Sequence, residues 1–597
     1  MQKQGVFNMS TLTLENFFTG KTFVIPSYQR DYAWTERNVD DLFGDVEEAI
    51  EVGGNHYLGT FILSQADRSA PVCVVDGQQR LTTLTMLMDA LIDVVEDEGI
   101  KQYYRNTFIH HPVTGAKFRV LGSNEAFFRD LLDDKYPTPE SDGQERMRKA
   151  YDRIRLRVKA LLDKGGQDYI KEWLFCVSNM EVLQFVEPNE GKAIRMFQSV
   201  NDRGVPLAKM DIVKSLLVYH SNRYLQGELD AFISEQFGRA FRSFSRIKRL
   251  AAEEGYKIRQ IDRKDFGEDD VLRYHYLSFS GDSFGVVVGN FWVTSEEVLQ
   301  SFLKPALQKL RAEPDRLKAF ISFYVLDLAK FFSAFEELIA ATRTDKQAYL
   351  LWVIQDLSTT LYPLVIRLHL NGWLGQVGNG DPRTLMEIVE MTDLRVFKIR
   401  GTNPQAEIFR ITRDLHHHNV DWVLQQLQAF CAWGMPDAMM VSRLSDEDVY
   451  RNPAVQRMLL EEEVKVRASL NVPGLDLSEI KNLVGNGLTV EHILPQDSGN
   501  SFNPMAYGFA TSEEYMQYVH RLGNLVLLES GINSACKNHA VEAKMSRPNL
   551  YLASSLRAVK AVAAQFAGNA PFGKSALLNR SKKLAEMMVE RWPIRYQ

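Results

Sequence analysis

One stretch near the end of the chain combines the residue types that metal-dependent hydrolysis of a phosphodiester requires. Glu491 and His492 close a short apolar run, and Asn524 and Asn533 lie 32 and 41 positions after the histidine. A neutral His492 would deprotonate a water, while Glu491 and Asn533 would supply the hard oxygen ligands that Mg²⁺ or Mn²⁺ prefers. We expect Asn524 to hold the adjoining loop or to orient His492. An isolated Glu-His pair is usually structural, and the ordered series of residues is what favours a ββα-metal nuclease site.

A second candidate site lies near the N-terminus, where an apolar run ends in Asp76-Gly77 and continues at once into a polar helix start. Free backbone N–H groups and the positive end of the helix dipole would point out of this turn, which suits phosphate binding. Arg80 would add a bidentate donor for phosphate, and Asp76 would hold a metal ion or polarise a water. A simple Asp-Gly turn before a helix is the alternative, and composition alone favours it.

Aromatic and polar side chains alternate between Tyr28 and Trp34. Gln29 and Arg30 stand next to stacking faces, a combination that reads an extruded base or a nucleotide. Aromatic residues that fill the core, with Arg30 paired to a neighbouring aspartate, explain the same pattern equally well. Both interpretations stay open.

The segment after residue 200 has the marks of a helix end. Asn201 and Arg203 are followed by a glycine and a proline, and the pattern continues to Asp211 and Lys214. Asn201 and Arg203 would complete a phosphate site if the segment is functional. A structural loop is the better interpretation from this one sequence.

Four arginines recur at intervals of three, four and three residues: Arg239, Arg242, Arg246 and Arg249. On a helix this spacing places four guanidinium groups on one stripe, which is suited to follow a nucleic-acid backbone. A charged face that answers an acidic neighbour is nearly as good an explanation. The consecutive histidines at 416–418 cannot all face one metal site on a helix.

Three regions of different pattern would position these residues. Short strand-like runs, turns and an amphipathic helix in the first hundred residues indicate a small α/β unit, and helical periodicity dominates from about residue 295 to 470. A loop-rich zone follows before the Glu-His motif. We therefore predict an α+β multidomain protein with regions 1–225, 226–474 and 475–597.

The composition is that of a globular protein, with 45% hydrophobic and 24% charged residues and a net charge of −6. The charge is uneven, because eleven basic and three acidic residues from Lys537 onward give +8 and leave −14 for the rest. We assign Lys537 and Lys544, in this basic part, to contacts with the DNA backbone. Four dispersed cysteines exclude a disulfide framework, and no segment is apolar enough to span a membrane, so we expect a cytoplasmic protein.

Together these motifs resemble the GmrSD-like family of modification-dependent (type IV) restriction enzymes, which includes SspE and BrxU. The N-terminal pattern of that family is matched by Ile25 to Trp34, Tyr57-Leu58-Gly59, Val75 to Thr83 and Phe197 to Leu207. Its nuclease pattern is matched by Glu491 to Gln496, Gly523-Asn524-Leu525, Asn533 and Lys544. Only Cys536 lies near the second pattern, so the zinc-stapled HNH variant is excluded.

The resemblance implies an N-terminal ParB/sulfiredoxin-like NTPase domain, a largely helical middle and a C-terminal HNH-like (His-Me finger) nuclease domain. It implies that a nucleoside triphosphate of unknown base is bound and hydrolysed by Asp76, Gly77, Gln78, Gln79, Arg80, Thr82, Asn201 and Arg203. The residues expected at that pocket, or as sensors of the DNA modification, are Tyr28, Gln29, Arg30 and Trp34. His492, with Asn524 and Asn533, would drive cleavage.

We therefore expect an NTP-regulated, Mg²⁺-dependent DNA endonuclease of a prokaryotic anti-phage restriction system, which recognises modified DNA, or its modification status, and cleaves or nicks it. A homodimer is expected, since one nuclease site per chain cuts two strands most easily in a pair. One alternative is a nucleotide-dependent DNA-binding regulator with an inactive finger, although His492 and Asn533 are both present. Another is a toxin-like RNase, which the basic C-terminal part suits equally well.

Overall fold

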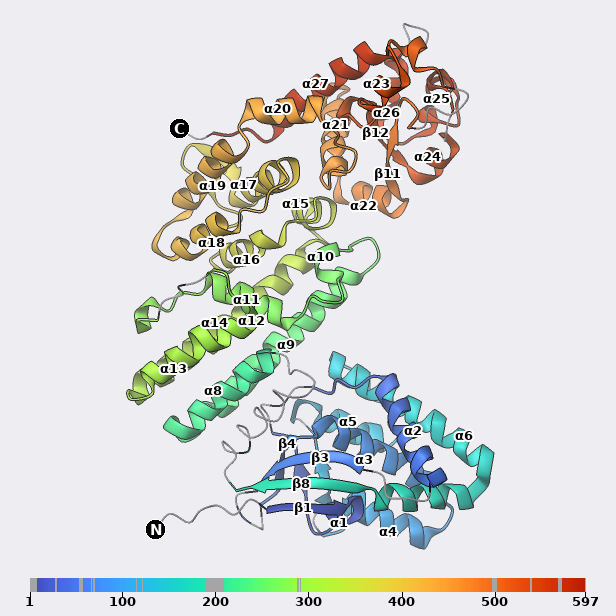
Figure 1. The fold of residues 1–597 in the computed structure, drawn as a ribbon, viewed down its shortest axis with the longest axis vertical. Coiled ribbons are helices and arrows are strands. Elements are labelled where there is room, and N and C mark those ends of the chain that lie inside the picture. The colour runs from blue at the N-terminus through green and yellow to red at the C-terminus, as the bar shows by residue number, and fades with distance from the viewer. Residues whose placement is uncertain are drawn as a thin grey trace. The chain divides into compact units, whose positions relative to one another are not determined.

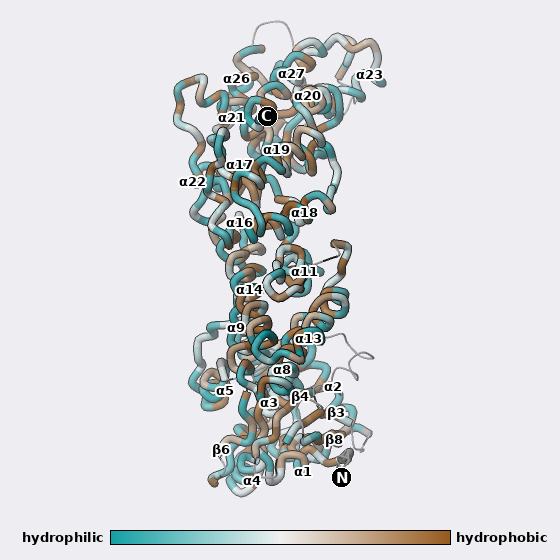
Figure 2. The backbone as a smooth tube through the Cα atoms, turned by 90° about the vertical axis from the view of Figure 1, so that its left-hand side faces the viewer, coloured by the Kyte–Doolittle hydropathy of each residue, from teal (hydrophilic) through white to brown (hydrophobic). Residues whose placement is uncertain are grey.

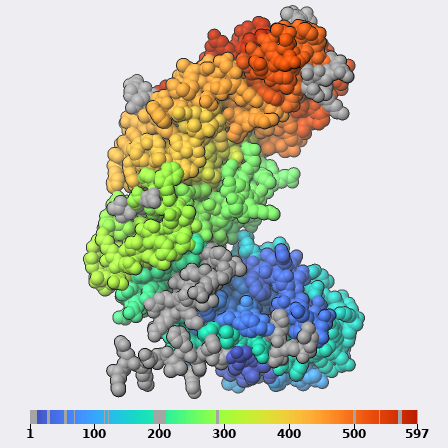
Figure 3. All heavy atoms as spheres, in the orientation of Figure 1, coloured from blue at the N-terminus to red at the C-terminus, as the bar shows by residue number. Residues whose placement is uncertain are grey.

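The computed structural model describes most of the chain. The described residues are 8–26, 29, 31–52, 57–65, 67, 70–113, 115–120, 122–188, 193, 209–286, 289, 291–496, 502–536, 539–566 and 572–595. They form two compact units, one of Met1–Ser245 and Leu299–Ala329, the other of Arg246–Val298 and Lys330–Gln597. Figure 1 shows the course of the chain, and Figure 3 marks in grey the atoms outside the described residues. The divisions predicted near residues 225 and 474 fall inside these units and remain predictions.

A six-stranded mixed sheet lies in the first unit, with its strands in the order β1-β8-β3-β4-β2-β7. The strands are β1 (Asn8–Thr13), β2 (Phe23–Val24), β3 (Tyr57–Ser64), β4 (Val72–Asp76), β7 (Phe118–Arg119) and β8 (Glu181–Glu187). Strand β3 runs parallel to β8 and antiparallel to β4, and β2 runs parallel to both β4 and β7 (Figure 1). Aromatic and β-branched residues are frequent in β3 and β4, which favours extended backbone, and most residues of the two strands are buried.

Helices make up the rest of the first unit. They are α1 (Leu14–Phe18), α2 (Glu36–Val52), α3 (Gln78–Asp93), α4 (Glu98–Phe108), α5 (Glu125–Leu132), α6 (Asp142–Asn179), α8 (Lys209–Leu225) and α13 (Lys304–Leu310), beside the short hairpin of β5 (His110–His111) and β6 (Gly115–Ala116). Helices α9 (Asp230–Ala252) and α14 (Pro314–Ala341) contain unit boundaries. Nearly every residue of α3 is buried, because it packs against both α4 and α6.

The turn between β4 and α3 requires a glycine. Gly77 has a φ of +96°, and a Cβ at this position would lie 2.4 Å from the ring of Phe61. Only glycine avoids both the strained backbone and the clash. The chain therefore passes from strand to helix through the single residue Gly77, with Asp76 as the last residue of β4.

The second unit is mainly helical. Its helices before the C-terminal part are α10 (Arg259–Asp262), α11 (Glu268–Ser278), α12 (Ser295–Glu297), α15 (Lys346–Tyr349), α16 (Tyr362–Leu370), α17 (Leu385–Thr392), α18 (Gln405–Asp414), α19 (Val420–Gly434), α20 (Asp437–Asp446) and α21 (Val455–Ser469), with a small hairpin of β9 (Val377–Gly378) and β10 (Asp381–Thr384). Figure 2 shows hydrophobic and hydrophilic residues interspersed along these helices, as expected where one face of each helix is buried.

The C-terminal part of the second unit contains a two-stranded antiparallel hairpin followed by a helix. Strand β11 (Leu488–His492) pairs with β12 (Leu525–Glu529), and α24 (Ser530–Cys536) follows β12 and packs against both strands. The surrounding helices are α22 (Leu477–Gly485), α23 (Ser512–Met516), α25 (Val541–Ser546), α26 (Arg557–Phe566) and α27 (Lys574–Arg591). This hairpin carries the Glu-His motif.

The observed class is α+β and predominantly helical, which confirms the predicted class and the helical middle. The ParB/sulfiredoxin-like and HNH-like assignments of the two ends remain expectations. Among the described residues, every helix is too short or too polar to cross a lipid bilayer.

Candidate active site

His492 is the last residue of β11, and its residue surface is only 5% exposed. Its Nε2 atom lies 3.0 Å from Nδ1 of His520. The ring of Tyr450 packs on both imidazoles, with centroid distances of 4.4 Å to His492 and 5.2 Å to His520. Burial, reinforced by the charges of His520 and Lys544, lowers the pKa of His492 to about 3. The imidazole is therefore neutral at neutral pH, the state in which histidine accepts a proton.

Asn524 is fully buried and holds the loop that follows β11. Its Oδ1 accepts a hydrogen bond from the backbone N–H of Leu494 at 2.8 Å. Its Nδ2 donates to the carbonyl of Leu494 at 3.2 Å and to that of Val519 at 2.8 Å. All three bonds go to backbone atoms, so of the two roles expected for Asn524 the structure displays the loop-holding one.

Gly523, the residue before Asn524, allows this loop to pack closely against the rest of the unit. A Cβ at Gly523 would lie 2.1 Å from the carbonyl oxygen of Leu577 on α27, so only glycine allows this approach. Arg580 of α27 donates to the carbonyls of Gly523 and Leu525 at 2.9 and 2.8 Å, and it pairs with Glu462 of α21. Helix α27 therefore clamps the start of β12, beside Asn524.

Glu491 and His492 have different neighbours, as expected because successive strand residues point to opposite faces. Glu491 is buried and accepts a hydrogen bond at 2.6 Å from Lys544, which also donates to the carbonyl of His492 at 2.7 Å. Burial raises the pKa of Glu491, and Lys544 offsets this only in part. Lys544 is 1% exposed, so its predicted contact with the DNA backbone is wrong for this arrangement: the ammonium neutralises a buried carboxylate instead.

Asn533 lies on α24 and donates through Nδ2 to Thr489 Oγ1 at 2.8 Å. Thr489 precedes Glu491 by two residues, so both side chains lie on the same face of β11 and His492 on the other. The two predicted metal ligands therefore have suitable oxygen atoms but do not converge with the predicted base. Within the described residues, no group of three or more His, Cys, Asp or Glu side chains is arranged to hold a metal ion. The described side chains do not by themselves form a ready-made Mg²⁺ site.

At the N-terminal site, two glutamines connect the segment after Pro26 to the turn between β4 and α3. Gln29 donates to the carbonyl of Val75 at 2.6 Å. Gln79 accepts from the N–H of Ala33 at 2.7 Å and donates to the carbonyl of Asp31 at 3.0 Å. The structure therefore brings together two motifs that lie about fifty residues apart, and it uses Gln79 as a clamp between them.

Other residues proposed for this site differ in accessibility. Arg80 packs over the ring of Phe61 and contacts Gly59, where a Cβ would lie 2.6 Å from the guanidinium. Burial lowers the pKa of Arg80, while the Asp76 carboxylate beside it acts in the opposite direction. Thr82 was predicted to bind the nucleotide. It is buried, and its hydroxyl donates to the carbonyl of Gln78 at 2.9 Å within the same helix.

The aromatic residues of the same segment are core residues where they are described. Tyr32 is buried, and its hydroxyl lies 2.8 Å from that of Thr83. Trp34 is half-buried and packs against the hydrophobic core of the first unit. For these two rings the core-filling alternative applies.

Lys214 of α8 joins the N-terminal site, a role that the sequence motif alone did not assign to it. Its ammonium is 3.5 Å from the carbonyl of Gln29, and the residue is 2% exposed. Burial lowers the pKa of Lys214 to about 7, and Asp211 and Asp31 counteract this effect. Burial also raises the pKa of Asp31, whose carboxylate is hydrogen-bonded by Asn124. The helical spacing of Asp211 and Lys214 was the available signal.

All four arginines of the predicted stripe lie on α9 and are exposed. Arg242 faces Asp31 closely enough to counteract the rise in its pKa. Arg246 pairs with Glu336 of α14 at 3.1 Å. For these two arginines the structure displays acidic partners, which was the alternative interpretation; DNA contact by the stripe stays a prediction.

Several predicted residues lie outside the described residues: Tyr28, Arg30, Asn201, Arg203 and Lys537. The consecutive histidines have separate partners, with His416 against the carbonyl of Ser278 and His417 near Asp282.

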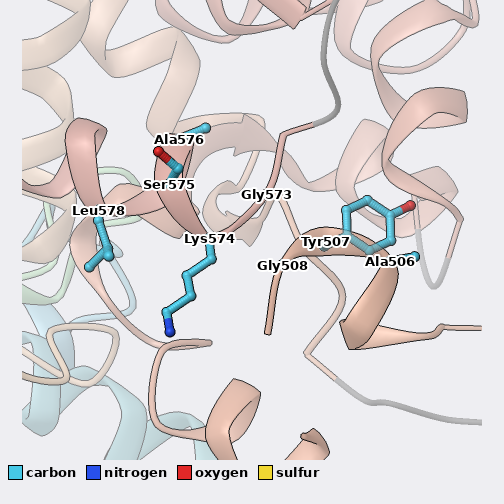
Figure 4. Close-up of a pocket in the computed structure, with 8 residues that line it drawn as sticks. All are labelled: Ala506, Tyr507, Gly508, Gly573, Lys574, Ser575, Ala576 and Leu578. Atoms are coloured by element: carbon cyan, nitrogen blue, oxygen red, sulfur yellow. The ribbon is translucent and has the colours of Figure 1, made fainter. Parts of the chain in front are cut away.

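A hollow of about 520 Å³ near the start of α27 is lined by Ala506, Tyr507, Gly508, Gly573, Lys574, Ser575, Ala576 and Leu578. Figure 4 shows the Lys574 side chain extending away from the Tyr507 ring; Lys574 pairs with Glu514. Residues 568–575 spell GNAPFGKS, the letters of a phosphate-binding loop, but such a loop follows a strand and here helix α26 precedes it. None of the candidate catalytic residues lines this hollow.

Comparison with known families agrees with the order of the two motif groups. Residues 14–218 match the family described as GmrSD restriction endonuclease, N-terminal domain, and residues 437–587 match GmrSD restriction endonucleases, C-terminal domain. The two matches cover more than half of the 597 residues. By class the protein is a restriction endonuclease, an enzyme that acts on DNA. It belongs to the GmrSD family, as the sequence resemblance implied. No curated protein matches the chain.

Proposed function

We propose that this protein is an NTP-regulated, Mg²⁺- or Mn²⁺-dependent endonuclease that recognises modified DNA and cleaves or nicks it as a defence against phage. The observation that carries the proposal is His492, a neutral histidine at the end of the first strand of a hairpin that is followed by a helix, within the segment that matches the C-terminal GmrSD domain. The N-terminal segment around Asp76 would bind the nucleotide.

In the proposed reaction, His492 takes a proton from the attacking water. The resulting hydroxide bonds to phosphorus, the bond from phosphorus to the leaving oxygen breaks, and that oxygen is protonated from solvent. Asn524 keeps the chain after His492 in place through its three backbone hydrogen bonds. A divalent ion would stabilise charge on the phosphate. The residues that would hold it are Glu491 and Asn533, through their side-chain oxygen atoms.

His492→Ala should lower cleavage of modified DNA in Mg²⁺ by at least about 100-fold, because it removes the general base, and should leave NTP hydrolysis unchanged. His369→Ala is the matched control, since His369 also bonds a neighbour through Nε2 but lies away from the hairpin. Retained cleavage by the His492 variant would refute the catalytic assignment. Chelation with EDTA and restoration by Mg²⁺ or Mn²⁺ tests the metal requirement separately.

Asp76→Ala and Arg80→Ala should each lower NTP turnover, because both groups lie at the β4–α3 turn that would bind the phosphates. Arg129→Ala is the control, since Arg129 forms a partly exposed pair with Glu125 within one helix. Thermal unfolding of each variant separates loss of folding from loss of turnover. Unchanged NTP turnover in folded Asp76 and Arg80 variants would refute the proposed nucleotide site.

The substrate is best identified with matched DNA that is unmodified, hydroxymethylated, glucosylated or phosphorothioated, assayed with and without each NTP, and with RNA of the same sequence. Selective cleavage of one modified DNA supports the proposal. Cleavage of RNA alone would favour the toxin-like RNase, and nucleotide-dependent binding without cleavage would favour a regulator. Sedimentation of the full chain tests the expected homodimer.

A further inference from the structure

His520 lies directly beside His492, although no motif singled it out. It lies between α23 and β12, 28 residues after His492, and its Nδ1 atom is 3.0 Å from Nε2 of that residue. The backbone of His520 is itself fixed, because its carbonyl accepts a hydrogen bond from the N–H of Val449 at 3.1 Å. A distance of 3.0 Å between two ring nitrogens is a hydrogen bond in which one ring donates and the other accepts.

Tyr450 holds the two rings in this arrangement. Its ring is stacked on His520 with an interplanar angle of 11° and contacts His492 at an angle of 57°. The loop that carries Tyr450 is tied down by Asn452, whose side chain donates to the carbonyl of Lys398 at 2.9 Å. The pair of imidazoles is therefore braced from the helical part of the second unit.

The hydrogen bond leaves one nitrogen of His492 for chemistry. Nε2 is occupied by His520, whereas Nδ1 makes no hydrogen bond to any described residue. His492 as a whole keeps 5% of its surface exposed. If His520 accepts at Nδ1, the proton of neutral His492 resides on Nε2, and its Nδ1 carries the lone pair that can accept a proton.

We propose that His520 is a positioning residue for His492: its Nδ1 accepts the Nε2 proton, which fixes the orientation and tautomer of the base and leaves His492 Nδ1 to take the proton from water. This rests on the proposed nuclease function. A partner that fixes the tautomer acts on the chemical step and not on DNA binding, which separates it from a DNA-contacting residue.

The test compares two replacements of His520 in the full chain. His520→Leu removes the hydrogen bond while it keeps an apolar side chain of similar size, and His520→Asn keeps a side-chain amide near the position of Nδ1. We expect His520→Leu to lower kcat for cleavage by about 10- to 100-fold with KM for DNA within about twofold, the range known for lost second-layer hydrogen bonds. His520→Asn should recover most of kcat. His369→Leu is the control and should cleave normally.

Nitrogen-15 NMR of histidine-labelled protein gives a second, non-kinetic readout. In the wild type and in His520→Asn, His492 should be protonated on Nε2, and His520→Leu should show a mixture of tautomers. Normal kcat in folded His520→Leu, or a wild-type His492 protonated on Nδ1, would overturn the proposal. The second criterion decides even if His520→Leu fails to fold. Cleavage that survives in His492→Ala would instead refute the catalytic assignment of His492, whereas a wild-type protein that cuts no DNA would show that the proposed function itself is wrong.

Discussion

Lys544 illustrates how one buried contact redefines a residue's role. Its ammonium lies between the carboxylate of Glu491 and the carbonyl of His492, and the residue is almost inaccessible to solvent. A phosphate of bound DNA cannot reach it without breaking these bonds. Its positive charge therefore stabilises the end of β11 that carries the proposed base.

Lys544→Met should destabilise the second unit by about 3 kcal/mol or more, because it leaves the Glu491 carboxylate buried without a counter-charge. The double variant Glu491→Gln/Lys544→Met should recover part of this loss. Denaturant unfolding measures both, with exposed Lys582→Met as the control. The salt dependence of DNA binding should be the same as in the wild type. A shallower slope with unchanged stability would restore the DNA-contact role.

Helices α3 and α6 meet through a buried carboxyl group. Asp89 of α3 accepts a hydrogen bond from the hydroxyl of Tyr151 of α6 at 2.5 Å, and Asp93 and Arg105 lie nearby. Burial, and then the charge of Asp93, raise the pKa of Asp89 to about 7, against the lowering effects of Tyr151, Arg105 and Arg155. Between pH 3.8 and about 7, Asp89 therefore keeps its proton in the folded protein, whereas in the unfolded chain, with a pKa of 3.8, it has released it.

The sign of the pH effect follows from this raised pKa. The contribution of protonated Asp89 to the free energy of unfolding is fully present below pH 3.8 and is lost as the pH rises through about 7. Asp89→Asn should remove this loss and raise the stability of the first unit at pH 8 relative to the wild type, by up to about 4 kcal/mol for a shift of this size. Thermal unfolding at pH 5 and pH 8 measures it, with exposed Asp152→Asn as control. Equal pH dependence in Asp89→Asn and the wild type would contradict the argument.

At the scale of the whole molecule, the C-terminal segment makes buried contacts with the helices before it. Trp592 is buried; its indole N–H donates to Glu390 of α17 at 3.0 Å, and its carbonyl accepts from Arg395 at 2.8 Å. Arg383 donates to the carbonyl of Pro593 at 2.8 Å. Region 475–597 therefore shares buried contacts with those parts of region 226–474 that belong to the second unit.

Trp592→Ala should lower the stability of the second unit by about 3 to 5 kcal/mol, because it removes a large buried side chain and a partner of Glu390. Trp433→Ala is the control, since Trp433 is 74% exposed. Calorimetry of the full chain should show the hairpin and the helices of this unit unfolding in one transition. A variant in which only residues 475–597 unfold would contradict the shared core.

The sequence by itself determined the features that depend on near neighbours and on motif order. The strand–turn–helix at Asp76, the strand that ends at His492, the helical middle and the family were all predicted, because backbone preferences and side-chain periodicity are encoded within a few residues. Tertiary structure alone decided which distant groups meet. His520 and Tyr450 at His492, Lys214 at Gln29, and Lys544 at Glu491 are separated by 28 to 185 residues. Whether a charged side chain faces solvent or a buried partner depends on the packing of segments that are distant in the sequence, so a local sequence pattern cannot predict it.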